Sequence, residues 1–375
     1  MHRTAPLPWA KGWAGALAIA TLLVAVVVAS CPEREPTAIS PLAWAPKLRG
    51  GWFAAWGEEP LTGPTARAEL ETMRRMGFEW LAYSPEIEMP DVTKPEFRDG
   101  TPIAEVEAVV RFYRTMGFRV FVLPRIESPD FYRAKNPTWR GDLKMTDDRS
   151  WDLFHERLGD EVVRYATAAD GAGAELYALG LEYRQAVVAK PEAWRRMAER
   201  VRKVFRGRIT YSANWYKEFE EVAFWDALDC IGIGAYFPLT RDLGASDVDL
   251  EEGWDEVLVD VERVAKVNRK SVVFTEVGFP TYRDAAVRPW EWTREDGKVI
   301  DASKQAQCYR SMFASLQRRS WFEGFFLWRY YNNRVKVGRW DYSPQNKAAE
   351  DVVRTAWKGL GKGAESAPAS NPTGR

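Results

Sequence analysis

Two glutamates in the chain each follow a run of mainly apolar residues. Glu182 comes directly after Ala-Leu-Gly-Leu (178–181), and Glu276 comes after Val-Val-Phe-Thr (272–275). Such runs are typical of buried strands, so each glutamate is predicted to lie at the carboxyl end of a strand. Two carboxyl groups that face each other across a cleft can hydrolyse a glycosidic bond. The alternative for either glutamate alone is a structural ion pair with a nearby arginine.

Aromatic, amide and guanidinium side chains end several other predicted strands. Aromatic rings can stack on the flat faces of sugar rings, and polar groups can bond their hydroxyls, so this mixture is typical of a carbohydrate site. The alternative for the aromatic residues is packing at the ends of the strands. The candidate substrate-binding residues are Trp56, Arg125, Asn214, Trp215, Tyr236 and Trp328.

Eight apolar runs alternate with eight segments of helical pattern. The predicted strands are 52–56, 78–83, 118–123, 176–181, 209–213, 230–236, 272–276 and 322–328. The predicted helices are 65–76, 103–116, 151–169, 191–205, 219–227, 250–267, 303–317 and 347–357. Continuous apolar strands alternating with helices predict a parallel sheet covered by helices, and eight units predict a closed barrel. We therefore expect the α/β class and a single (β/α)8 TIM barrel over residues 48–360, with both glutamates at its mouth.

The first thirty residues have the composition of an export signal. A weakly basic start precedes an almost unbroken apolar run (14–29), and Val28-Ala29-Ser30-Cys31 resembles a bacterial lipobox. We expect a signal peptide (1–30), a lipid on Cys31, a tether (31–47) and a disordered tail (361–375). The domain would then be membrane-anchored in the bacterial cell envelope, at the outer membrane or the periplasmic face. The alternative is an uncleaved anchor, although ~16 residues is short against the ~20 that span a bilayer.

The composition excludes several other classes. The 53 basic residues balance the 53 acidic ones, so nothing favours nucleic acid as a partner. With two histidines and no Cys/His cluster a zinc site is not expected, and the two-carboxylate chemistry needs no cofactor. Cys230 and Cys308 could pair, but we expect two small buried hydrophobes. We expect a monomer that acts on a polysaccharide or oligosaccharide.

Four segments of the chain resemble glycoside hydrolase family 113. They are ITYSANWY (209–216), FWDALDCIGIGAYFPL (224–239), VVFTEVGFP (272–280) and FFLWRYYN (325–332), and the resemblance extends from Gly51 to about Trp357. Members of that family are (β/α)8 barrels of clan A, best known as endo-β-1,4-mannanases. The resemblance therefore implies the same fold and a β-linked polysaccharide as substrate.

The resemblance also implies roles for individual residues. By position, Glu182 matches the acid/base of clan A and Glu276 the nucleophile. Tyr236 matches a tyrosine that contacts the nucleophile, and Trp328 matches the floor under the reacting sugar. The chain departs from the pattern at Leu181, where many clan A enzymes have an asparagine that bonds the sugar 2-hydroxyl. Asn214 is a candidate to replace it.

These expectations amount to a retaining glycoside hydrolase. Retention needs a carboxyl separation of about 5–5.5 Å, whereas about 6.5–9.5 Å would favour inversion. We expect Glu182 to hold its proton, and Tyr236 and a nearby arginine to keep Glu276 ionised. The alternatives are a hydrolase of glucan, xylan or an envelope polysaccharide, a transglycosylase, and a non-catalytic glycan-binding lipoprotein.

Overall fold

The structure is a computed structural model that describes residues 48–57, 59–133, 135, 137–291 and 297–357. The predicted signal peptide, Cys31, the tether and the tail lie outside the described residues, and their boundaries stay predictions. Within the described part, no helix is both long and apolar enough to cross a membrane.

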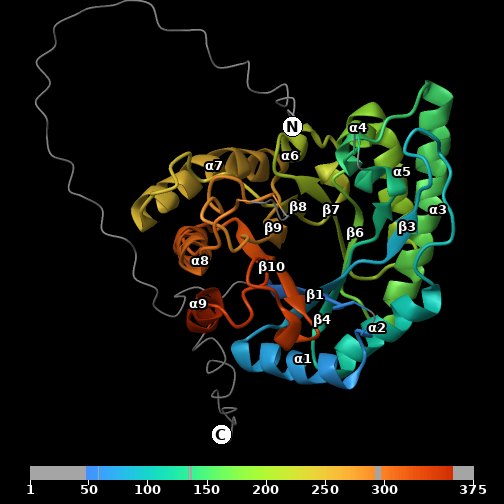
Figure 1. Cartoon of the computed structure of the whole chain (residues 1–375). Coiled ribbons are helices and arrows are strands. Elements are labelled where there is room, and N and C mark those ends of the chain that lie inside the picture. The colour runs from blue at the N-terminus through green and yellow to red at the C-terminus, as the bar shows by residue number, and fades with distance from the viewer. Residues whose placement is uncertain (1–47, 58, 134, 136, 292–296, 358–375) are drawn as a thin grey trace, which may run out of the picture. The chain divides into compact units, whose positions relative to one another are not determined.

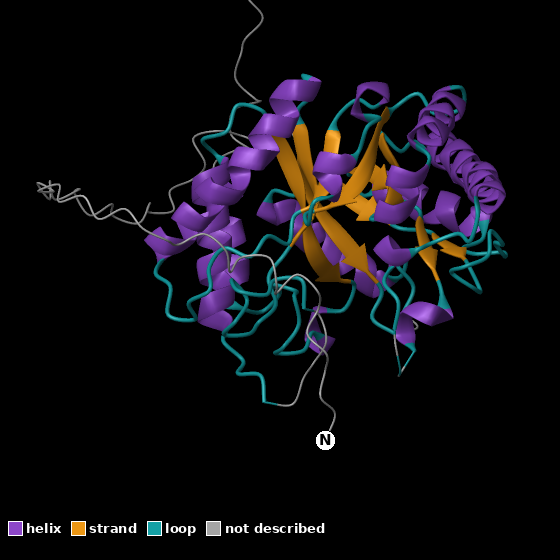
Figure 2. Ribbon diagram, turned by 90° about the horizontal axis from the view of Figure 1, so that it is seen from above, coloured by secondary structure: helices purple, strands orange, loops and turns teal. Residues whose placement is uncertain are grey.

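Eight parallel strands close into a barrel, which confirms the predicted fold (Figures 1 and 2). Each strand pairs with the next around the ring, and the last pairs with the first. In spatial order they are β1 (Leu48–Ala54), β2 (Trp80–Tyr83), β4 (Arg119–Val122), β6 (Leu176–Leu181), β7 (Arg208–Asn214), β8 (Ile231–Gly234), β9 (Val272–Val277) and β10 (Phe322–Tyr331).

Helices surround the strands, as Figure 2 shows. The longer ones are α1 (Pro64–Met76), α2 (Ile103–Thr115), α3 (Asp148–Ala172), α5 (Pro191–Arg202), α7 (Asp247–Asn268), α8 (Ala302–Leu316) and α9 (Ala348–Trp357). The side chains of Asp147, Ser246 and Asp301 accept hydrogen bonds from backbone N–H groups at the starts of α3, α7 and α8, and these bonds fix where the helices begin. Gly77 ends α1 at a φ of 100°, a conformation that favours glycine.

Short elements occupy the connections between strands and helices. They are the helices α4 (Arg184–Ala189) and α6 (Glu218–Glu221) and the 3₁₀ turns η2 (Pro129–Tyr132), η3 (Arg140–Asp142), η4 (Trp225–Ala227) and η5 (Arg334–Lys336). The predicted helix 219–227 is wrong: it is divided into α6 and η4. The buried side chains of Phe219, Phe224 and Trp225 are five and six positions apart, so one helix could not turn all three to the same face.

Two further differences bear on the barrel mouth. A two-stranded sheet, β3 (Glu86–Glu88) with β5 (Arg125–Glu127), lies outside the barrel and was not predicted. β1 spans Leu48–Ala54, so Trp56 lies in the loop beyond it. Glycine is uncommon inside strands, so Gly50 weakens the strand pattern in the sequence. The barrel requires a glycine there, because a Cβ on Gly50 would lie 2.3 Å from the Phe326 ring.

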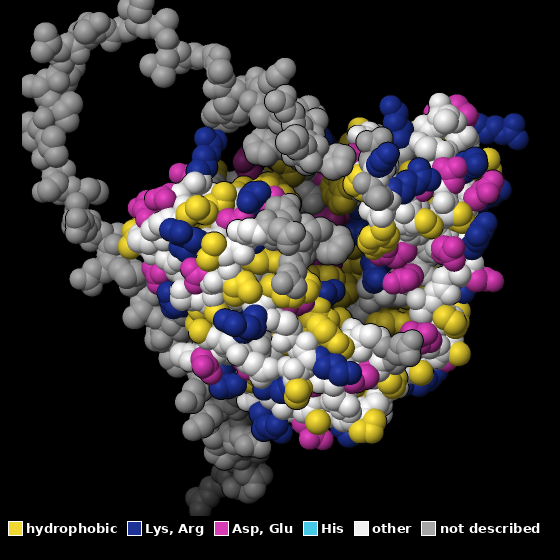
Figure 3. All heavy atoms as spheres, viewed as in Figure 1, with side chains coloured by type: hydrophobic (Ala, Val, Ile, Leu, Met, Phe, Trp, Pro, Cys, Tyr) yellow, Lys and Arg dark blue, Asp and Glu magenta, His cyan; other side chains and the backbone are white. Residues whose placement is uncertain are grey.

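The interior of the barrel is filled with side chains. Trp52, Trp80, Phe121 and Phe326 form its apolar centre together with Cys230. Cys230 and Cys308 are both free and buried, which confirms that they serve as small hydrophobes. On the face seen in Figure 3, apolar side chains gather toward the middle and charged ones are spread around the edge.

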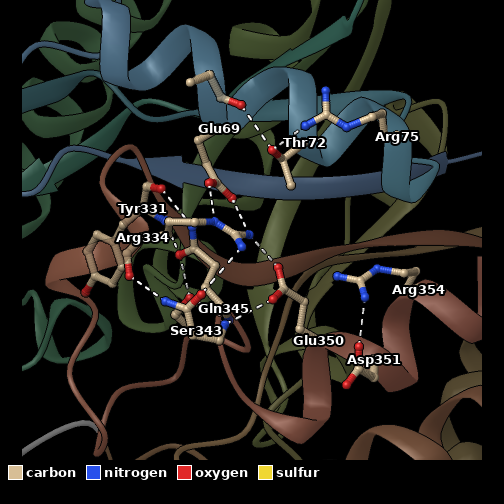
Figure 4. Close-up of polar contacts among 12 residues, drawn as sticks. Glu69, Thr72, Arg75, Tyr331, Arg334, Ser343, Gln345, Glu350, Asp351 and Arg354 are labelled. Carbon is tan, nitrogen blue, oxygen red and sulfur yellow. Dashed lines mark hydrogen bonds and ion pairs between the residues drawn. The ribbon is translucent and has the colours of Figure 1, made fainter.

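A polar network ties the segment after β10 to two helices (Figure 4). The Arg334 guanidinium pairs with Glu69 of α1 at 2.7 Å and with Glu350 of α9 at 2.6 Å. Both carboxylates are almost fully buried. Gln345 accepts a hydrogen bond from the Tyr331 backbone N–H at 2.8 Å and donates to its carbonyl at 2.9 Å. The network therefore fixes the end of β10 relative to the outer helices.

Replacing Arg334 with leucine should destabilise the fold, because Glu69 and Glu350 would be left as buried charges without a cation. Losing one partner of such a pair costs about 3 kcal/mol of unfolding free energy. Arg354 offers a matched control, since it is half exposed and pairs with the exposed Asp351, and Arg354→Leu should cost at most about 1 kcal/mol. Urea unfolding of both variants measures the difference. Equal losses would show that the network contributes no more than a surface ion pair.

Candidate active site

Glu182 and Glu276 lie at the carboxyl ends of β6 and β9, as predicted. Each is about 7% exposed. Gly234 of β8 is the register partner of Glu276. A Cβ on Gly234 would lie 3.1 Å from Oε1 of Glu182, so the glycine leaves room for that carboxyl to reach toward β9. The barrel thus brings the two glutamates together from strands that are not neighbours.

The Glu182 carboxyl is held by two hydrogen-bond donors. Nδ2 of Asn214, at the end of β7, donates to Oε1 at 2.8 Å, and the indole of Trp139 also donates to the carboxyl. The amide of Asn214 has a defined orientation because its Oδ1 accepts from the backbone N–H of Tyr216 at 2.7 Å. Burial raises the pKa of Glu182, while the charge of Arg140 and the two hydrogen bonds oppose that rise.

The Glu276 carboxyl has a different set of neighbours. The Tyr236 hydroxyl donates to Oε2 at 3.0 Å. Burial raises the pKa of Glu276 to about 8, and the charge of Glu182 adds to the rise. The expectation that Tyr236 and a nearby arginine keep Glu276 ionised is therefore wrong, because these groups do not outweigh burial. Tyr236, Arg140 and Arg125 do lower the pKa, but burial has the larger effect.

The half-buried Trp328 of β10 lies next to the end of β9, the strand that carries Glu276. Its ring packs edge-on against Trp52 at 5.4 Å between centroids. The indole of Trp52 donates to the carbonyl of Thr275, the residue before Glu276, at 2.8 Å. The guanidinium of Arg329 lies over the Trp328 ring at 5.3 Å. These contacts place Trp328 next to the end of β9 and restrict its ring.

The other two candidate tryptophans are also half-buried and packed on rings. Trp56 packs edge-on against Tyr331 at 4.9 Å, and its backbone N–H donates to Oδ1 of Asn332 at 2.8 Å. Trp215, next to Asn214, stacks on Trp290 from the segment after β9, with centroids 5.0 Å apart and planes 29° apart. Each therefore presents a ring of defined orientation near a strand end.

Arg125 belongs to the outer sheet through β5. Its guanidinium pairs with Glu86 at 2.5 Å and with Glu127 at 2.6 Å, and it donates to the carbonyl of Ser84 at 3.1 Å. Its charge reaches Glu276 as one of the smaller influences on that pKa. A direct contact of Arg125 with substrate stays a prediction.

Several residues of the site were not found from the sequence. Arg140 is the first residue of η3, and Trp139 comes directly before it. Both lie in a long connection without an apolar strand before it. Their signal is a tryptophan–arginine pair in an otherwise polar stretch, Asn-Pro-Thr-Trp-Arg-Gly-Asp (136–142). Nε of Arg140 is buried without a hydrogen-bond partner among the described residues, although its Nη2 pairs with Glu127 at 3.3 Å. Arg140 influences both catalytic candidates, Glu182 and Glu276.

Comparison with known proteins identifies this barrel. The model of Glycoside Hydrolase Family 113 matches residues 51–349. A GH113 β-mannanase from Alicyclobacillus acidocaldarius, solved in complex with ManMIm, is 26% identical, and the match covers 85% of this chain and 99% of that one with a TM-score of 0.71. A complex of a GH113 β-1,4-mannanase is 25% identical, with 83% and 99% covered and a TM-score of 0.71.

More distant structures share the fold alone. A β-glucuronidase from Ruminococcus gnavus is 14% identical, and the match covers 83% of this chain and 50% of that one with a TM-score of 0.57. No curated protein matches the chain. The family match covers most of the chain and confirms the resemblance seen in the sequence. The chain belongs to Glycoside Hydrolase Family 113 and is a glycosidase.

Proposed function

We propose that this glycosidase is a retaining endo-β-1,4-mannanase in which Glu276 is the nucleophile and Glu182 the acid/base. The observation that carries the proposal is the meeting of these two buried carboxyls across Gly234 at the barrel mouth. The choice of mannan rests on the two solved β-mannanases at 26% and 25% identity. Hydrolysis of another β-glycan and transglycosylation remain the alternatives.

In the first step, an oxygen of Glu276 attacks the anomeric carbon and the glycosidic C–O bond breaks. Glu182 gives its proton to the leaving oxygen, and a covalent glycosyl-enzyme is formed. Tyr236 bonds Oε2 of Glu276, so Oε1 is the candidate attacking atom. Trp328, Trp56 and the stacked pair of Trp215 with Trp290 provide aromatic surfaces for sugar rings.

In the second step, Glu182 takes a proton from water as the water attacks the anomeric carbon. The bond to Glu276 breaks, and the product keeps its original configuration. The raised pKa of both carboxyls means that the pair retains a proton near neutral pH. The first step requires this proton to be on Glu182 when the sugar is bound. Asn214 and Trp139 hold the Glu182 carboxyl in place through their hydrogen bonds.

A panel of polysaccharides tests the substrate. We expect β-mannan and glucomannan to lose viscosity well before many reducing ends appear, because an endo-acting enzyme cuts inside the chain. Glu276→Gln should abolish the release while remaining folded. Cleavage of cellulose or xylan with mannan untouched would replace the proposed substrate, and release of longer products than the substrate would favour transglycosylation.

Azide rescue separates the roles of the glutamates. In Glu276→Ala no glycosyl-enzyme can form, so azide should attack an activated glycoside directly and give a glycosyl azide of inverted configuration. In Glu182→Ala the nucleophile is intact, and azide should intercept the intermediate and give the retained configuration. NMR of the products measures both outcomes. The opposite assignment of configurations would exchange the two roles.

The pKa of Glu276 should depend on Glu182. Because the negative charge of Glu182 raises it, Glu182→Gln should lower the pKa of Glu276 from about 8. NMR titration of ¹³C-labelled glutamate carboxyls measures the change, and Glu221→Gln, on the exposed side of α6, should leave it unaltered. In the wild type, kcat/KM should fall as the pH rises through about 8, since the pair then loses the proton that the first step needs. An unchanged pKa in Glu182→Gln would contradict the coupling.

We also propose export with a lipid on Cys31, supported by the lipobox-like sequence 28–31. The wild type should separate with membranes after cell fractionation and begin at Cys31. Cys31→Ala should remain unlipidated, and mass spectrometry of the amino-terminal peptide would detect the difference. Recovery of unprocessed wild type from the cytoplasm would refute this proposal.

A further inference from the structure

One buried carboxyl near the site has no part in the mechanism above. Glu218, the first residue of α6, is fully buried. Its Oε1 accepts a hydrogen bond from the Tyr211 hydroxyl at 2.6 Å, and its Oε2 accepts from the backbone N–H of Asn214 at 2.7 Å. Burial raises the pKa of Glu218 to about 8, although the two hydrogen bonds lower it. Because an apolar side chain could fill this space without burying a carboxyl, the contacts of Glu218 need an explanation.

Both partners of Glu218 lead to Glu182. Asn214, whose backbone it holds, donates its side-chain N–H to Oε1 of Glu182 at 2.8 Å. Tyr211 accepts at its hydroxyl from the backbone N–H of Tyr183, the residue after Glu182, at 2.6 Å. Glu218 is thus two hydrogen bonds away from the Glu182 carboxyl on one side and from its backbone on the other.

The backbone of Glu182 needs such support. Its φ is 58°, in the left-handed region that residues with a Cβ seldom adopt. A conformation of this kind persists where neighbouring contacts hold it. The backbone N–H of Glu182 donates to Ser212 at 2.8 Å, and the bond between Tyr183 and Tyr211 holds the next peptide. Both contacts come from β7, the strand whose end Glu218 also holds.

We propose that Glu218 is a positioning residue that keeps Glu182 where a general acid must be. This inference rests on the proposed function, in which Glu182 donates the proton. Proton transfer requires the acid to lie within about 3 Å of the leaving oxygen, and a small misplacement lowers the rate strongly. Among the described residues, Tyr211, Glu182 and Arg184 of α4 are titratable or charged groups that influence the pKa of Glu218.

Replacing Glu218 with glutamine would disturb these hydrogen bonds while keeping the size of the side chain. The hydroxyl of Tyr211 already accepts from Tyr183, so its own hydrogen points to Glu218, and the N–H of Asn214 can only donate. Both oxygens of Glu218 therefore accept, which the protonated carboxyl can do as well as the ionised one, because its hydroxyl oxygen keeps an acceptor lone pair. An amide would place an NH₂ group against one of these donors. Glu221 offers a matched control on the same short helix, since it is partly exposed and pairs with Arg184 at 2.6 Å.

The test uses aryl β-glycosides of the sugar that the wild type cleaves, with leaving groups of graded acidity. A good leaving group needs little proton donation, whereas a poor one depends on the acid. Glu218→Gln should lower kcat/KM by at least about 10-fold for the poorest leaving group and by less than about 3-fold for the best. Glu182→Ala should give a steeper dependence in the same direction. Glu221→Gln should follow the wild type, and a uniform loss across the series in Glu218→Gln would overturn the proposal.

A double variant provides the second measurement. If Glu218 acts through Glu182, adding Glu218→Gln to Glu182→Ala should cause no further loss with the poorest leaving group that Glu182→Ala still cleaves, although Glu218→Gln alone lowers kcat/KM for that substrate. An equal loss in both backgrounds would assign Glu218 a general structural role instead. Circular dichroism and thermal unfolding check that the variants fold. If Glu218→Gln does not fold, Tyr211→Phe replaces it, because this change breaks the link to Tyr183 and should give the same steeper dependence.

The experiment also separates this inference from the proposed function. If Glu182→Ala keeps the shallow dependence of the wild type, Glu182 is not the acid and the proposed roles fail. If kcat/KM depends steeply on the leaving group in Glu182→Ala, while its dependence in Glu218→Gln is the same as in the wild type, the inference alone fails.

Discussion

The mutual repulsion of two buried carboxyls is the constraint on which the barrel mouth depends. Glu182 and Glu276 are each almost fully removed from solvent, and the charge of Glu182 raises the pKa of Glu276. Such a pair persists only where neighbouring groups hold it in place. Asn214 and Trp139 donate to one carboxyl, Tyr236 donates to the other, and Arg140 influences both. Every one of these neighbours is a donor or a cation, which offsets part of the penalty of burial.

The barrel provides positions that an open sheet could not. β6 and β9 are separated by two strands, yet their ends lie at one mouth because the sheet closes. Strand order places Gly234 of β8 between Asn214 and Glu276, and the absence of a side chain there lets the Glu182 carboxyl approach β9. The fold therefore sets the distance between the two groups through strand order and one small residue, while the loops supply the surrounding donors.

The sequence predicted what depends on local pattern. The eight strands, the class of fold and the glutamates at two strand ends follow from apolar runs and from the residues that come directly after them. Asn214 and Tyr236 were found for the same reason. Trp139, Arg140 and Trp290 were missed because they reach the site through long connections whose path depends on tertiary contacts. The helix expected at 219–227 failed because burial of aromatic residues from different faces outweighed its periodicity.

The state of ionisation was the least predictable property of the site. Tyr236 and two arginines do lower the pKa of Glu276, as the residue types suggested, but burial and the charge of Glu182 outweigh them. Burial depends on how completely the loops close over the strand ends, and no local pattern reports that. The same holds for Glu218, which looks like a surface residue beside Glu220 and Glu221 in the sequence. Only the packing of α6 against β7 turns its carboxyl inward, toward the strand end that positions Glu182.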